Sequence, residues 1–73
     1  MERKRFLELC QINAVSPYSV IVLYGGMECY PKALKIWFNS AGETQNTAVL
    51  IEKKSRCVIE CRISEIKSLD KEQ

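Results

Sequence analysis

The chain contains no histidine, and the residue arrangements that usually support catalysis are missing as well. Without imidazole it lacks the commonest general base and the commonest ligand of catalytic metal ions. Its carboxylates form no pair at a spacing typical of acid–base catalysis, and neither the serines nor Cys29 have an apparent activating base, which a nucleophile requires. We therefore expect no catalytic residues, no cofactor and no enzymatic activity.

Long apolar runs are also missing. The longest, such as residues 20–24, fall far short of the roughly 20 residues that cross a bilayer. The first five residues carry charge, but no apolar run of signal-peptide length follows them. We expect a cytoplasmic protein with no membrane partner.

The chain is short, which limits the core that it can bury. Its 73 residues are about half of a typical domain, so we expect a single domain that spans residues 1–73. Hydrophobic residues make up 47% of the chain and charged residues 27%, which is typical of a folded protein. A core this small usually needs a disulfide, a metal or a partner subunit. The net charge of +2 favours a nucleic-acid partner only weakly.

Cysteines stand at positions 10, 29, 57 and 61, but their spacing matches neither a zinc site nor a disulfide framework. Structural zinc sites usually pair cysteines with two to four residues between them, and only Cys57 and Cys61 come that close. Residues 57–63 alternate as a strand does, which places these two thiols on one face about 13 Å apart. We expect buried thiols and no metal. Zinc or redox chemistry and disulfides between two copies are the alternatives.

Hydrophobic spacing predicts a helix that leads into a series of strands. Phe6, Leu9 and Cys10 recur at helical spacing, and Pro17 disfavours continuation of the helix beyond the residue before it. The predicted elements are a helix over about 2–13, strands over about 18–24, 27–38, 47–52 and 57–63, and a tail over 70–73. Residues 64–69 fit a helical turn and a short closing strand almost equally well.

Short connections favour an antiparallel meander. Gly25 and Gly26 predict a tight hairpin turn, because glycine tolerates positive φ. Pro31 cannot donate a ladder hydrogen bond, so it marks a bulge or an edge position. The predicted fold class is α+β, mainly β, in which the N-terminal helix packs on a small, strongly bent antiparallel sheet of four to five strands or on an SH3-like barrel.

The order of helix, glycine hairpin and long bent second strand, with the closing stretch Arg-Ile-Ser-Glu-Ile at residues 62–66, resembles the Sm-like family, especially its bacterial Hfq branch. The resemblance covers about residues 5–69 and implies a helix on a small five-stranded barrel and ring-like assembly. The chain departs from the family at Pro31, where a glycine is usual. It also lacks the tyrosine, lysine and histidine signature, since residues 58–61 read Val-Ile-Glu-Cys. The family's RNA-binding residues therefore do not carry over.

The basic segment between the last two long strands is the first candidate site. Lys53, Lys54, Ser55 and Arg56 place three cations and a hydroxyl in one short turn. Such a turn can hold a phosphate or another anion with its side chains and backbone amides. A solvated turn without a ligand is the alternative.

Aromatic residues form the second candidate site. Alternation over 27–38 predicts that Leu34, Ile36 and Phe38 face the core and that Trp37 faces outward beside Lys35. An outward tryptophan can stack on a base, or it can be covered by another subunit or by the helix. Tyr24 and Tyr30 flank the glycine hairpin and extend the same patch.

These features predict a binding module that is not an enzyme. We expect a homo-oligomer, assembled through a strand edge or the Trp37 face, because both faces of the strand over 27–38 carry large apolar groups. The expected ligand is a nucleotide or single-stranded RNA or other nucleic acid, held by the basic turn and the aromatic residues. The alternative is a small protein-binding inhibitor or adaptor of the kind that phages and other mobile elements encode.

Overall fold

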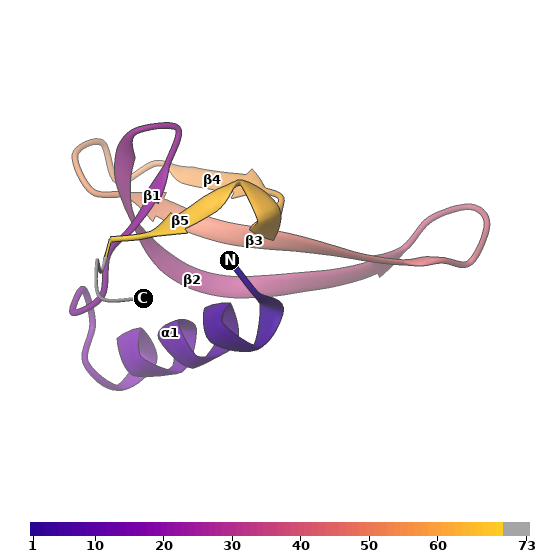
Figure 1. Ribbon diagram of the computed structural model, residues 1–73, viewed down its shortest axis with the longest axis horizontal. Coiled ribbons are helices and arrows are strands. Elements are labelled where there is room, and N and C mark those ends of the chain that lie inside the picture. Colours follow the sequence, from indigo (N-terminus) through magenta and orange to yellow (C-terminus); the bar gives the residue numbers. More distant parts are fainter. Residues whose placement is uncertain (70–73) are drawn as a thin grey trace.

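One helix and an open antiparallel sheet of five strands form the fold. The computed structural model describes residues 1–69, so the tail expected over 70–73 lies outside the described residues. The elements are α1 (Arg3–Val15), β1 (Val22–Tyr24), β2 (Met27–Phe38), β3 (Thr44–Glu52), β4 (Val58–Cys61), the short 3-10 helix η1 (Ile63–Glu65) and β5 (Ile66–Ser68). The sheet order is β4-β3-β2-β1-β5, with β4 and β5 at the two edges (Figure 1). The predicted α+β fold is confirmed, with the sheet open rather than closed into a barrel.

Helix α1 packs its apolar side chains into the sheet and so defines two faces. The buried core consists of Phe6, Leu9, Val22, Cys29, Ala48, Leu50, Cys61 and Ile66. Because side chains alternate along a strand, the neighbours of Ala48 and Leu50 on β3 point away from this core. We call that side the outer face. Strand register places on it Tyr30, Ala33, Lys35, Trp37, Gln45, Thr47, Val49, Ile51, Val58 and Glu60.

Asn13 fixes the chain after the helix and explains why the first strand is shorter than the predicted 18–24. Its side-chain oxygen accepts hydrogen bonds from the backbone N–H groups of Ser19 (3.1 Å) and Val20 (2.8 Å). Its amide nitrogen donates to the carbonyls of Val20 (3.1 Å) and Pro31 (3.3 Å). These bonds occupy backbone groups that a strand would pair. The segment is therefore a loop, and α1 runs past its predicted end at residue 13. Within residues 1–69, no helix has the length and apolar character needed to cross a membrane.

Two predicted irregularities around β2 are confirmed. Gly25 (φ 57°) and Gly26 (φ 82°) form the turn between β1 and β2, and both adopt the positive φ that such a hairpin turn requires. The register between β2 and β3 shifts between Pro31 and Ala33, which is a bulge at the expected place. At the bulge, the carbonyl of Pro31 accepts a hydrogen bond from the side chain of Asn13 near the end of α1.

The distal parts of β2 and β3 form a long hairpin that projects beyond α1 (Figure 1). We call residues 36–46 the arm. Strand β3 starts at Thr44, because it pairs there with Phe38, so the loop predicted over 39–46 is shorter than expected. The side-chain oxygen of Asn39 closes this loop by accepting hydrogen bonds from the N–H groups of Ala41 and Glu43 (both 2.9 Å).

The prediction that Leu34, Ile36 and Phe38 all face the core is wrong for two of them. Leu34 packs against the core, whereas Ile36 is 51% exposed and Phe38 is 69% exposed. Alternation decides which face a side chain takes, but it does not decide whether another element covers that face. Helix α1 does not reach the arm, so it does not cover the apolar side chains there.

The end of the described chain combines both predicted forms of the closing segment. Strand β4 covers only Val58–Cys61 of the strand predicted over 57–63. The 3-10 turn η1 follows, and then β5 pairs antiparallel with β1. The sequence ambiguity over 64–69 thus reflects a helical turn and a strand in succession.

Candidate functional site

The basic turn after β3 is held by its own polar groups. The N–H of Arg56 donates to the carbonyl of Glu52 (2.9 Å), and Arg56 adopts a left-handed conformation (φ 64°). The Ser55 hydroxyl donates to the Glu52 carboxylate and accepts the N–H of Cys57 (3.2 Å). Ser55 therefore stabilises the turn itself, and the phosphate contact predicted for it stays a prediction.

The side chain of Arg56 extends from the turn and lies over two tyrosine rings. Its guanidinium carbon lies 4.5 Å from the ring centroid of Tyr18 and 5.5 Å from that of Tyr30. The two rings meet edge to face, with centroids 4.8 Å apart. Tyr18 is 56% exposed and Tyr30 only 7% exposed. We call these three residues the tyrosine–arginine cluster: a buried ring supports an exposed ring and an exposed cation.

Backbone strain coincides with this contact. Among residues 1–69, Tyr18 (φ 63°) and Arg56 (φ 64°) are the non-glycine residues with positive φ. Such a conformation costs a bulky side chain about 1–3 kcal/mol, and strain of this kind concentrates at functional sites. A cation–π contact at an exposed site returns only about 0.5–1 kcal/mol. The cation–π contact alone therefore does not offset the cost of the two positive φ angles.

A hollow of about 280 Å³ opens beside the cluster, between the end of α1 and the bulge of β2. It is lined by Cys10, Asn13, Ala14, Pro17, Tyr18, Tyr30, Pro31, Lys32 and Ile51. This volume lies near the lower end of ligand pockets, which is about 300 Å³, so the hollow suits one small group. Lys32 brings a second cation to its border. Burial raises the pKa of the Cys10 thiol to about 11, so Cys10 stays a neutral thiol near pH 7.

The structure does not bring the side chains of the predicted basic residues together at one place. The ammonium of Lys53 lies 3.3 Å from the carboxylate of Glu28, and its backbone N–H donates to the carbonyl of the same residue (2.9 Å). Lys53 and Lys54 border a separate hollow beside the glycine hairpin, together with Met27. Of the turn, only Arg56 reaches the tyrosines, according to the contacts among the described residues.

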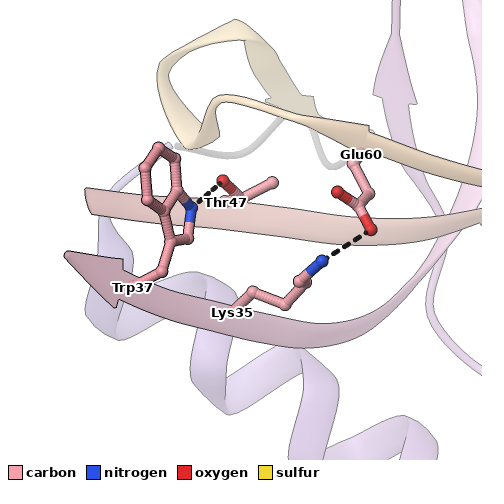
Figure 2. Close-up of polar contacts among 4 residues, drawn as sticks. All are labelled: Lys35, Trp37, Thr47 and Glu60. Carbon is pink, nitrogen blue, oxygen red and sulfur yellow. Dashed lines mark hydrogen bonds and ion pairs between the residues drawn. The ribbon is translucent and has the colours of Figure 1, made fainter. Parts of the chain in front are cut away.

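Lys35 and Trp37 lie together on the outer face, as predicted, but their polar groups are engaged (Figure 2). The Lys35 ammonium lies 3.0 Å from the Glu60 carboxylate, and the indole N–H of Trp37 donates to the Thr47 hydroxyl (3.0 Å). Trp37 remains 47% exposed. Tyr24 instead packs against the core from β1, away from this patch.

Sequence reasoning missed Tyr18 and Lys32. The sequence predicts Tyr18 at the start of a strand, yet Tyr18 lies in a turn. Hydrogen bonds of Asn13 to the residues after it and a contact with Arg56, far along the chain, hold it there. Lys32 lies in the bulge and has no partner on β3. The sequence predicts the bulge at Pro31, but it does not predict the position of the Lys32 side chain. The signal that could have found Tyr18 is the pairing of Pro17 with a preceding serine, which favours a turn.

The thiols are distributed between the core and the surface. Burial raises the pKa of Cys29 and Cys61, in the case of Cys61 to about 11 with added repulsion from Glu65 and Cys29. Cys29 and Cys61 are thus buried, as predicted, whereas Cys57 is exposed because the strand starts after it. In the part of the chain that the structure describes, no group of three or more Cys, Asp or Glu side chains is placed to hold a metal ion.

Comparison with protein families, with curated proteins and with solved structures finds no significant match to this chain. The Sm-like resemblance of the sequence stays a prediction.

Proposed function

We propose that this chain is a non-enzymatic binding module for a nucleotide or single-stranded nucleic acid. The contact of Arg56 with Tyr18, 4.5 Å from guanidinium to ring, is the observation that carries the proposal. A guanidinium plane and an exposed tyrosine both stack on bases, and the guanidinium also binds phosphate. The hollow beside them accepts one small group, with Lys32 at its border.

Titration with a labelled three-nucleotide oligothymidylate, followed by fluorescence anisotropy, tests this function. Arg56→Gln and Tyr18→Ala are each expected to weaken binding about tenfold, since one stacked base contributes roughly 1–3 kcal/mol. Affinity should also fall as salt rises, because phosphate contacts release counterions.

Arg3→Gln is the matched control for this titration. It removes the same charge at the start of α1, and the 13 residues of that helix separate it from Tyr18 by about 20 Å. Equal affinity of the wild type and the Arg56→Gln variant would reject the proposal.

The arm supports a second candidate, a small protein-binding inhibitor or adaptor. Ile36 and Phe38 are exposed on one face of the arm and Trp37 on the other. Exposed aromatic and aliphatic side chains of this kind anchor protein interfaces. Binding of such a partner should persist at high salt. It should be lost in the Phe38→Asp variant and retained in the Arg56→Gln variant. The opposite response of the two variants would favour the nucleic-acid function.

Oligomer formation is part of the proposal. The sheet ends in two short edge strands, β4 and β5, whose outward backbone groups can pair with another copy. Association of copies would also enlarge a small core. Light scattering at micromolar concentration should therefore report more than one subunit, and a monomer under those conditions would remove this part of the proposal.

A further inference from the structure

The outer face connects the tyrosine–arginine cluster with Trp37. Tyr30 lies opposite Ile51 in the register of β2 and β3, and Trp37 lies opposite Gln45. Strand β3 runs from residue 51 to residue 45 between these two rows, a length of about 20 Å at roughly 3.3 Å per residue. Two aromatic groups thus stand at the two ends of one sheet face.

The surface between the two ends is apolar near the tyrosine–arginine cluster. Ala33 lies opposite Val49, and Val58 lies opposite Ile51 on the same face. Val58 and Ala33 are exposed. Ala33 and Val58 thus give exposed apolar surface next to the cluster, although Val49 itself is only 8% exposed. The row before Trp37 consists of Lys35 and Thr47, so the surface there is polar.

Cations border this surface. Arg56 and Lys32 lie at the end with the cluster, and Lys35 lies in the row next to Trp37 on the same face. Glu60 holds the Lys35 ammonium at 3.0 Å, and both side chains are about half exposed. Exposed pairs of this kind are weak, so a phosphate group can compete with Glu60 for Lys35.

We propose that the ligand is an extended single-stranded oligonucleotide that runs along the outer face from the tyrosine–arginine cluster to Trp37, rather than an isolated nucleotide. This inference rests on the function proposed above and assigns its ligand class and path. A length of about 20 Å corresponds to roughly six nucleotides at the 3.4 Å spacing of a stacked strand. Proteins that bind single strands without sequence preference combine cations along the backbone with aromatic side chains on which the bases stack.

The length of the ligand provides the direct test. Trp37 is the single tryptophan of the chain, so its fluorescence reports the far end of the path. A twelve-nucleotide oligothymidylate should quench this fluorescence, whereas a three-nucleotide one bound at the cluster should not. The longer ligand should also bind well over tenfold more tightly, since the stacking contact adds to the roughly tenfold gain that its overlapping registers give by themselves.

Three variants distinguish binding along the whole outer face from binding at the tyrosine–arginine cluster alone. Trp37→Ala should weaken binding of the twelve-nucleotide ligand about tenfold and leave the three-nucleotide ligand unchanged. Ile36→Ala is the matched control, because Ile36 is the exposed neighbour of Trp37 on the opposite face of the same strand. Glu60→Gln should tighten binding of the longer ligand by about two- to fivefold, because it frees Lys35.

The outcomes distinguish the two proposals. Equal affinity for both lengths, or a Trp37→Ala variant that binds the longer ligand as well as the wild type does, would overturn the path while leaving the cluster as the binding site. Absence of binding to either ligand would overturn the path and the proposed function together.

Discussion

Tyr18 and Arg56 share a left-handed backbone and touch each other, although one precedes β1 and the other follows β3. Their φ angles are 63° and 64°, and the guanidinium lies 4.5 Å from the ring centroid. Both loops present side chains where glycine or asparagine would be less strained. The contact therefore joins two loops, each through a residue that carries backbone strain.

Replacing Arg56 by asparagine should separate stability from binding. Asparagine tolerates positive φ better than arginine, so the relief of strain offsets the lost cation–π contact. We expect the free energy of unfolding in urea to stay within about 0.5 kcal/mol of the wild type or to rise. Binding of oligothymidylate should fall about tenfold. A loss of stability larger than about 1 kcal/mol would show that Arg56 is mainly structural.

Asn13→Ala should destabilise the fold strongly, although the Asn13 side chain is only half buried. The change removes the hydrogen bonds to Ser19, Val20 and Pro31 and leaves backbone groups without partners. We expect a loss of about 2–3 kcal/mol in urea unfolding. Gln11→Ala, at an exposed position of the same helix, is the control and should change stability by less than about 0.5 kcal/mol. Similar losses in both variants would contradict this role of Asn13.

The thiols should react with a maleimide in an order set by exposure. Cys57 is exposed, so it should be labelled first at neutral pH. Cys29 and Cys61 are buried and carry raised pKa values, so both access and ionisation protect them. Peptide mass spectrometry after brief labelling checks the order. Labelling of Cys29 or Cys61 at the rate of Cys57 would contradict the packing of the core.

Burial of Cys61 should make its contribution to stability depend on alkaline pH. Its pKa rises from 9.0 to about 11 on folding, so the thiol is neutral in both states below pH 9. Between pH 9 and 11 the unfolded chain ionises first, and the stability that the neutral thiol gives is lost. The stability difference between the wild type and Cys61→Ala should be constant below pH 9 and shrink by about 2 kcal/mol at pH 11. A difference that does not change with pH would contradict a buried thiol.

Local chemistry made much of the fold predictable. Gly25 and Gly26 require a turn with positive φ, and Pro31 requires an interruption of the ladder, so both features follow from single residues. The face of Trp37 and Lys35 also followed, because alternation is a local property of a strand. These features are independent of what packs against the strands.

Features that depend on distant partners were not predictable. Tyr18 leaves the expected strand because Asn13 binds the backbone after it and Arg56 covers its ring. The exposure of Phe38 depends on where α1 begins relative to the arm. The separation of Lys53 from Arg56 depends on Glu28, which comes from another strand. Tertiary contacts decided each of these cases.

The projection of the arm divides one pair of strands into two regions of different local stability. Near Cys29 and Leu50 the ladder of β2 and β3 is covered by the core, whereas around Phe38 and Thr44 it is held by its own hydrogen bonds. An isolated two-stranded ribbon is only marginally stable in water. Amide hydrogen exchange should therefore be fast in the arm and slow near the core, although both regions belong to the same two strands. A ligand that orders the arm would be detected first as slowed exchange at Trp37.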